Sequence, residues 1–134
     1  MSFLDFFEQK FEIQDLIESK SDSNHPQIMQ KLERLLKRGA EEQLWAKLTL
    51  GHYLTLRNID FERGIDLLLQ ASNEGNSLAS RRLGRIYWQG IHVAKDLEKG
   101  LEYLERALDY ASPYVKKNIE KEIFSLKMEF KIED

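Results

Sequence analysis

The sequence predicts an all-α protein built from tandem pairs of helices. Apolar residues recur with helical spacing along almost the whole chain, and no segment shows sustained alternation of apolar and polar residues. A motif recurs within the chain 33 to 36 positions later, a period typical of stacked helix pairs. The composition, 42% apolar and 32% charged with two prolines, is typical of a folded helical domain and too apolar for a disordered chain.

The first two helices are predicted from apolar spacing and from the polar segment between them. We expect a first helix over 3–18, with these residues towards the core: Phe3, Phe7, Phe11, Leu16 and Ile17. The segment 21–26, SDSNHP, is rich in turn-forming residues and predicts a loop. The second helix should then end at Gly39. Its predicted apolar face contains Ile28, Leu32, Leu35 and Leu36.

The centre of the chain contains an internal repeat. Residues 46–51 match residues 79–84 at an offset of 33, with Ala, Leu and Gly in common. Residues 60–71 match residues 96–107 at an offset of 36, with Asp, Glu, a basic residue, Gly, Leu and Ala in common. Each repeat is therefore expected to form one helical hairpin, and successive hairpins are expected to stack into an α/α solenoid.

The repeated residues have physical roles in such hairpins. Asp60 and Asp96 are expected to accept the free N–H groups at the start of the second helix of each pair. Ser112 and Pro113 have the order of an N-cap followed by proline in the first turn, and they predict the start of the last helix. Four small residues should let neighbouring helices approach closely: Ala46, Gly51, Ala79 and Gly84.

The pattern resembles the Sel-1-like repeat, a relative of the tetratricopeptide repeat. The second unit matches it at Ala79, Leu83, Gly84, Tyr87, Gly90, Val93, Asp96, Lys99, Tyr103 and Ala107. The first unit has a shorter loop and keeps Ala46, Leu50, Gly51, Asp60, Arg63 and Ala71. The resemblance covers about 44–111. It implies a solenoid of Sel-1-like, tetratricopeptide-like helix-turn-helix repeats, with about seven helices and capping helices at both ends.

Two departures from the family pattern lead to local predictions. His92 stands where the family has its second loop glycine, so a positive φ is expected there with mild strain. Gly64 and Gly100 stand where the family usually has alanine, inside helices, at a cost of ~1 kcal/mol each. Gly100→Ala is therefore predicted to stabilise the fold unless a neighbouring helix crosses at that position.

We expect a single helical-repeat domain over 1–134. Residues 1–40 would form N-terminal capping helices, 41–76 the first repeat, 77–112 the second, and 113–134 a C-terminal capping helix. Two repeats alone expose their apolar ends, which is why capping helices are expected.

Composition also predicts the compartment and excludes some ligands. The net charge of −3 argues against nucleic acid as the main ligand. No cysteine is present, which excludes disulfides and thiolate metal sites. Acidic residues near the start do not fit a signal peptide, and no apolar run approaches membrane-spanning length. We therefore expect a cytoplasmic protein that does not contact the membrane.

No catalytic, cofactor-binding or metal site is predicted. His25, His52 and His92 lie in three different segments without metal-ligand spacing. Nucleotide-binding glycine motifs and the serine-hydrolase elbow motif are absent from the sequence. We therefore do not expect an enzyme.

A partner-binding surface is predicted from the first helix of each pair, whose non-core positions should form a basic stripe with aromatic residues at one edge. The stripe consists of His52, Arg81, Arg85, Trp88, Lys117, Lys121 and Phe124. The alternative is a solvated face whose arginines pair with nearby glutamates, with Trp88 against the loop 90–95. Trp45 is expected in the core. The acidic segment 1–24 is a second candidate surface, suited to a basic partner, or else an ordinary solvated face.

These features favour a non-catalytic protein–protein interaction module. The resemblance implies an adaptor or scaffold, and for small bacterial members also a toxin inhibitor. The most specific hypothesis is a bacterial immunity protein that binds and neutralises a cognate toxin encoded nearby. The alternatives are an adaptor of another pathway, a hydrolase, or nucleic-acid binding through Arg81, Arg82, Arg85 and Trp88, which would cause retention on heparin. The partner and the oligomeric state are left open.

Overall fold

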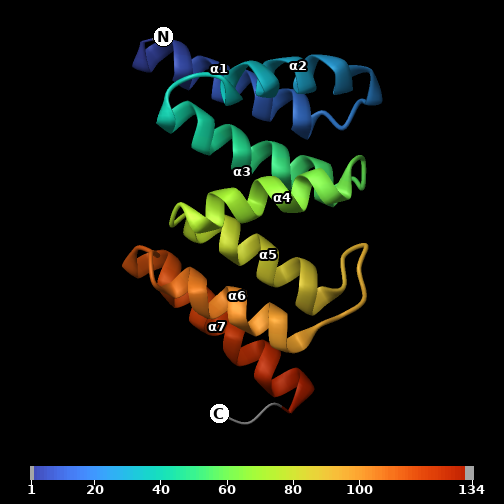
Figure 1. The fold of residues 1–134 in the computed structure, drawn as a ribbon, viewed down its shortest axis with the longest axis vertical. Helices are drawn as coiled ribbons and strands as arrows, with labels where there is room; N and C mark the ends of the chain where they lie inside the picture. Colours follow the sequence, from blue (N-terminus) through green and yellow to red (C-terminus); the bar gives the residue numbers. More distant parts are fainter. Residues whose placement is uncertain (1, 132–134) are drawn as a thin grey trace. The chain divides into compact units, whose positions relative to one another are not determined.

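The computed structural model describes residues 2–131, and that range contains helices and no strand. The all-helical prediction is confirmed. The elements are α1 (Phe3–Glu18), the short 3-10 helix η1 (Asp22–Asn24), α2 (His25–Leu36), α3 (Ala40–Leu56), α4 (Phe61–Asn73), α5 (Ser77–Gln89), α6 (Leu97–Leu108) and α7 (Pro113–Phe130) (Figure 1). The chain forms two compact units, residues 1–50 and residues 51–134, which are described separately below.

The first unit packs α1 against α2, and the bounds of α1 agree with the prediction. A capping box starts α1: the Ser2 hydroxyl accepts from the Asp5 backbone N–H at 3.2 Å, and the Asp5 carboxylate accepts from the Ser2 N–H at 3.4 Å. The buried face of α2 follows the predicted spacing. It contains Ile28, Leu32 and Leu35, each fully buried.

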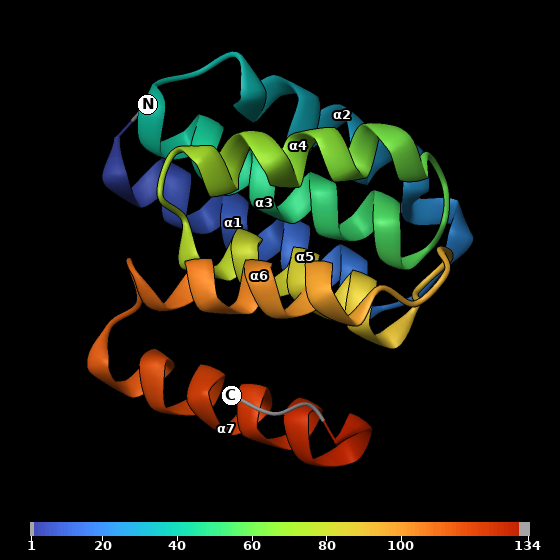
Figure 2. The same ribbon diagram turned by 60° about the horizontal axis from the view of Figure 1, so that its bottom comes forward.

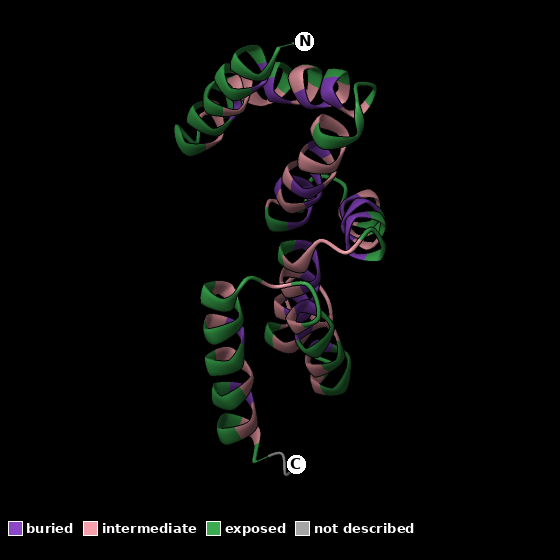
Figure 3. Ribbon diagram, turned by 90° about the vertical axis from the view of Figure 1, so that its left-hand side faces the viewer, coloured by how far each residue is buried: buried purple, intermediate pink, exposed green. Residues whose placement is uncertain are grey.

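The predicted core face of α1 is wrong at three of its five positions, whereas Leu16 and Ile17 are partly buried. Phe3, Phe7 and Phe11 are 75%, 53% and 66% exposed, whereas Phe6 and Ile13 are buried. Figure 3 shows that the ribbon at the N-terminal end of the chain is mostly exposed. Both sets follow helical spacing on the same helix, so periodicity alone does not choose between them. The contacts of Phe6 explain the observed choice, because its ring meets Trp45 edge-on at 6.2 Å between centroids.

The predicted loop over 21–26 is shorter than expected. Residues 22–24 form η1, and α2 begins directly afterwards at His25, with Pro26 in its first turn. The Asn24 side chain fixes this connection, because its amide donates to the Leu16 carbonyl at 3.3 Å. The turn-forming residues were recognised correctly, but they form a helical turn.

The second unit contains the end of α3 and helices α4 to α7. Helix α5 packs against α4 and α6, and α6 also packs against α7 (Figures 1 and 2). One apolar cluster joins α6 to α7 and contains Leu104, Ala107, Ile119 and Leu126, all fully buried. The Ser72 and Ser80 hydroxyls share a buried hydrogen bond of 2.6 Å between α4 and α5.

Glycines bring successive helices close together in the same way in both repeats. A Cβ built on Gly51 would lie 2.8 Å from Leu68 Cγ and 3.0 Å from the Gly64 carbonyl oxygen. A Cβ built on Gly84 would lie 2.8 Å from Leu104 Cγ and 3.0 Å from the Gly100 carbonyl oxygen. The residues aligned in the sequence therefore occupy matching packing positions, and the predicted close approach at Gly51 and Gly84 is confirmed.

The predicted helix starts and the predicted strained loop residue are also confirmed. The carboxylates of Asp60 and Asp96 accept from the N–H groups of Arg63 and Lys99, at 3.3 Å and 3.0 Å. His92 has a φ of 57°, in the left-handed region that favours glycine. Its ring offsets part of this strain, because Nε2 lies within hydrogen-bonding distance, 3.3 Å, of the Leu56 carbonyl oxygen.

Candidate functional site

A pocket of about 460 Å³ lies in the second unit, where the end of α3 and the helices α5 and α7 contribute side chains. The lining combines a cluster of charged groups with an apolar wall. The charged and polar side chains include His52, Arg81, Arg82, Arg85, Trp88 and Glu122. The apolar side chains are Leu56, Ile86 and Ile91. We refer to this site as the arginine pocket.

The repeat explains why these residues meet. His52 and Arg85 are 33 positions apart, as are Thr55 and Trp88, so each pair occupies equivalent positions in α3 and α5. Arg81, Arg85 and Trp88 lie four and then three residues apart along α5, which places them on one side of that helix. The pocket therefore depends on the register of the repeat.

Glu122 from α7 pairs with two of the arginines. Arg81 Nε donates to Glu122 Oε2 at 2.9 Å, and Arg85 donates through Nε and Nη2 to both oxygens of the same carboxylate. The Glu122 side chain is only 10% exposed, whereas Arg85 is 43% exposed. This bidentate arrangement fixes the two guanidinium planes at the pocket wall.

Arg82 is the third guanidinium of the pocket, and it has no carboxylate partner among the described residues. Its Nε atom is buried and has no hydrogen-bond acceptor within residues 2–131. Burial, followed by the positive charges of Arg85 and Arg81, lowers the pKa of Arg82 below its ordinary value. A guanidinium still keeps its proton at neutral pH, so the Arg82 side chain is a cation that no carboxylate of the described residues pairs with.

Trp88 presents a second buried donor to the same pocket. The indole Nε1 is buried and has no acceptor in the described part of the chain. The ring is held by contact with Phe130, edge-on at 6.4 Å between centroids, and Trp88 Cβ lies against Gly100. The indole is therefore fixed in orientation while its N–H is unpaired, which is costly in a buried position.

His52 is neutral in this setting. Burial, and then the positive charges of Arg82 and Arg85, lower the pKa of His52 from 6.5 to about 4. The neighbouring Thr55 hydroxyl donates to the backbone carbonyls of Gly51 and His52, at 2.8 Å and 3.1 Å. The hydroxyl is thus engaged with its own helix.

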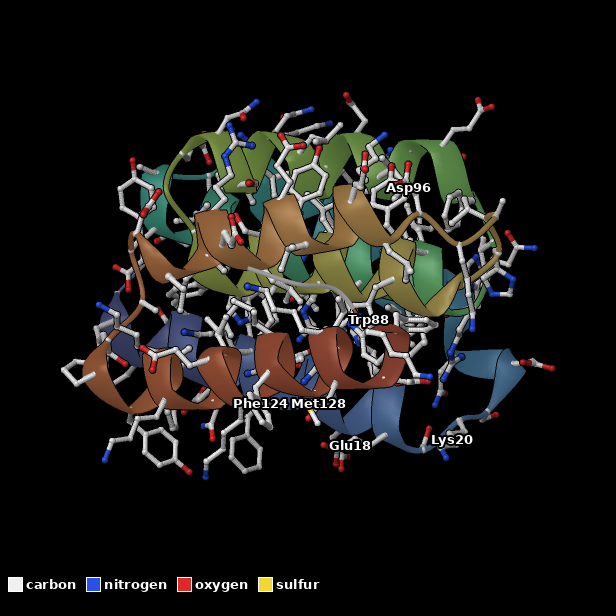
Figure 4. All side chains as sticks on the ribbon, turned by 90° about the horizontal axis from the view of Figure 1, so that it is seen from below. Glu18, Lys20, Trp88, Asp96, Phe124 and Met128 are labelled. Atoms are coloured by element: carbon white, nitrogen blue, oxygen red, sulfur yellow. The ribbon has the colours of Figure 1, made fainter. Side chains whose placement is uncertain are left out.

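The structure brings together four of the seven predicted stripe residues. His52, Arg81, Arg85 and Trp88 line the arginine pocket. The other three, Lys117, Lys121 and Phe124, line a separate, more open groove on α7. Figure 4 shows Phe124 projecting from α7 on the side opposite Trp88. The predicted continuous stripe is therefore divided into two surfaces.

Sequence reasoning missed the roles of Arg82 and Glu122. Arg82 was expected on a solvated face or, in the nucleic-acid alternative, on a basic binding surface, yet its Nε is buried. The expected pairing of arginine with glutamate is present, but the glutamate is 37 to 41 residues away. The only signal for Glu122 was its place on the last helix, three residues after Ile119, which is fully buried.

The acidic segment lies in the first unit and has an aromatic edge. The rings of Phe3, Phe7 and Phe11 are neighbours along α1, at 6.4 Å and 6.2 Å between successive centroids. Glu8 and Glu12 lie beside Phe7 and Phe11 around a shallow groove. This surface combines exposed aromatic rings with negative charge, and no buried unpaired polar side-chain atom occurs in it among the described residues.

Residues 2–131 contain no group of three or more histidine and carboxylate side chains arranged to hold a metal ion. None of the helices in this range has both the length and the apolar character needed to cross a bilayer. In comparisons with protein-family models, curated proteins and solved structures, nothing matched the chain.

Proposed function

We propose that the chain is a non-catalytic protein-binding module and that its partner docks on the arginine pocket. The observation that supports this best is the partly buried Arg82 beside Trp88, two side chains with unpaired buried donors in one pocket. Arginine and tryptophan are enriched at binding hot spots, which lie in desolvated pockets. A partner side chain that accepts hydrogen bonds is the kind of group that these donors lack.

The fold proposed for this module is a Sel-1-like solenoid of two repeats with capping helices. The matched packing of Gly51 against Leu68 and of Gly84 against Leu104 supports the repeat. In such arrays, neighbouring helices of successive repeats form a shared binding surface. The contribution of equivalent positions of α3 and α5 to one pocket agrees with that use.

The narrower proposal is that the chain is a bacterial immunity protein that acts in the cytoplasm. It neutralises a toxin that is encoded by a neighbouring gene. This proposal rests on the resemblance of the repeat stated above. An adaptor role in another pathway uses the same surface. The arginine pocket favours both over a hydrolase, because the Thr55 hydroxyl is bonded to backbone carbonyls and the Glu122 carboxylate is bonded to arginines.

The proposal is tested by co-purification at native expression from the source cell, with identification of the proteins recovered. Wild type is compared with Arg82→Met, which removes the unpaired guanidinium, and with Arg106→Met, which removes an exposed one from α6. A specific partner should be recovered by wild type and by Arg106→Met and be lost with Arg82→Met. Equal recovery of every protein by all three chains would contradict the proposal.

The immunity hypothesis has its own test. The chain is co-expressed with the product of each neighbouring gene, and cell survival is measured. Protection by wild type and loss of protection by Arg82→Met would support it. If no neighbouring product binds and no protection is seen, the chain is not an immunity protein.

A further inference from the structure

We propose that the arginine pocket binds a carboxylate on a short apolar stem, supplied by an acidic side chain of the partner protein. This inference rests on the proposed function, since it names the chemistry that the partner presents. It depends on three features of the pocket: its charge, its unpaired donors and its apolar wall.

The charge of the pocket requires an anion. Three guanidinium groups and one carboxylate line the pocket, and His52 is neutral, so these side chains carry a net charge of plus two. Glu122 is already engaged by Arg81 and Arg85. The remaining cation is Arg82, whose partial burial makes an unpaired charge expensive. A bound anion removes that penalty.

The unpaired donors define how the anion is held. Arg82 Nε and Trp88 Nε1 are both buried, and neither has an acceptor among the described residues. Carboxylate oxygens accept strong hydrogen bonds from guanidinium and indole N–H groups, the two kinds of donor found here. Neutral acceptors could use the same N–H groups, but they would leave the charge of Arg82 uncompensated.

The apolar wall favours a carboxylate with carbon attached over a bare inorganic anion. Leu56, Ile86 and Ile91 complete the lining beside the arginines. A hydrophilic phosphate ion gains nothing from this wall, whereas the methylene groups of a glutamate side chain, or an adjacent leucine, would be desolvated against it. An acidic residue with an apolar neighbour in the partner fits both parts of the pocket.

The direct test is an NMR titration of the full-length chain at low salt, observing the side-chain N–H signals of arginine and tryptophan. The probes are 4-methylpentanoate, acetate, neutral 4-methylpentanamide and inorganic phosphate. We expect 4-methylpentanoate to shift the signals of Arg82 Nε and the Trp88 indole, with a Kd on the order of 1 mM. The Trp45 indole, which is in the first unit, is the internal reference and should not shift.

The relative affinities of the four probes identify the chemistry of the ligand. Acetate should bind several-fold more weakly than 4-methylpentanoate, and the amide and phosphate should cause no saturable shift. Saturable binding of phosphate as tight as that of 4-methylpentanoate would show a general anion site and overturn the carboxylate assignment. Absence of any saturable shift of the Arg82 and Trp88 signals would also overturn it.

Variants locate the binding. Arg82→Met should weaken binding at least tenfold, whereas Arg106→Met should leave it unchanged. Glu122→Gln should tighten binding several-fold because it frees Arg81 and Arg85, whereas Glu120→Gln, on the exposed face of the same helix, should not. Trp88→Phe removes only the indole donor and should weaken binding a few-fold. Equal affinity in wild type and Arg82→Met would contradict the inference.

Failure of this inference can be told apart from failure of the proposed function. If a protein partner is captured through Arg82 but no carboxylate probe binds, the function stands and the ligand chemistry is wrong. If carboxylates bind and no protein partner requires the pocket, the chemistry stands and the source is a free metabolite. Elution of the captured partner by 4-methylpentanoate, and not by the amide, supports both the proposed function and the carboxylate inference.

Discussion

Gly100 of α6 lies directly against Trp88 of α5: a Cβ built on the glycine would be 2.7 Å from Trp88 Cβ and 2.9 Å from the Trp88 backbone nitrogen. The equivalent pair in the first repeat is Gly64 and Thr55, with 2.6 Å to Thr55 Cγ2. These contacts explain why glycine stands inside two helices in spite of its low helix propensity. The contact at Gly100 also helps to position Trp88, which lines the arginine pocket.

The first prediction follows from this contact. Gly100→Ala should lower the free energy of unfolding by about 1 to 3 kcal/mol, because the added methyl group forces α5 and α6 apart. This reverses the stabilisation expected from helix propensity alone, since the crossing that would prevent it is present. Urea denaturation measures the change.

The control for this prediction is an exposed position of the same helix. At Glu105, the alanine variant should be more stable than the glycine variant by roughly 1 kcal/mol, the ordinary preference of a helix. A higher melting temperature for Gly100→Ala than for wild type would show that the close approach at Trp88 does not exist.

The second prediction concerns the face of α1. Phe6 and Phe7 are neighbours in sequence, but Phe6 is 3% exposed and Phe7 is 53% exposed. Phe6→Ala should destabilise the first unit by about 3 to 5 kcal/mol, as is usual for a buried phenylalanine. Phe7→Ala should change the free energy of unfolding by less than about 1 kcal/mol. Thermal unfolding followed by circular dichroism distinguishes them, and the opposite order would restore the face predicted from sequence.

The third prediction concerns the ion-paired carboxylate of the pocket. Glu122→Gln should lower the free energy of unfolding by about 1 to 3 kcal/mol, because Arg81 and Arg85 lose their shared partner. The effect is smaller than for a fully buried pair because Arg85 is 43% exposed and water screens its charge. Chemical denaturation compares Glu122→Gln with Glu120→Gln, and equal stability of the two variants would mean that the pairing contributes nothing.

The fourth prediction is a pH dependence from His52. Its pKa is about 4 in the folded chain against 6.5 as the ordinary value, so between these pH values only the unfolded chain binds the proton. The contribution of neutral His52 to the free energy of unfolding is therefore complete above about pH 6.5, and it is lost as the pH falls towards 4. The loss should be between about 1 and 3 kcal/mol, allowing for the partial exposure of the ring.

The matched variant for this prediction is His52→Gln, which does not titrate in this range. The difference in the free energy of unfolding between wild type and variant should shrink as the pH falls from 7.5 to 4.5, while shared effects of the carboxylates cancel. A difference that stays constant over this range would show that Arg82 and Arg85 do not act on the histidine as described.

Local sequence patterns predicted the helices, the caps and the repeat because these depend on residues close together in the chain. Asp60 and Asp96 bond N–H groups three residues away, so their roles follow from spacing alone. Leu50 and Leu83 occupy aligned positions of the repeat, and both are fully buried. The composition of the pocket was predictable only where it reused repeat positions, as at His52 and Arg85.

The remaining features depend on contacts between distant residues or on a choice between equivalent faces. Glu122 reaches Arg81 across 41 positions, and no local signal predicts that pairing. Two apolar faces of α1 have similar spacing, and the contact between Phe6 and Trp45 decides between them. The burial of Arg82 Nε likewise depends on packing around α5, so a charged run that looks like a solvated surface contains a pocket residue.

The affinity of an identified partner for wild type and for Arg82→Met tests the central claim most directly. Both chains are titrated with the purified partner by calorimetry at the same salt concentration, with Arg106→Met as the charge-matched control. The Kd should rise at least tenfold for Arg82→Met and stay unchanged for Arg106→Met. The same Kd for all three chains would contradict a partner-binding role for the arginine pocket.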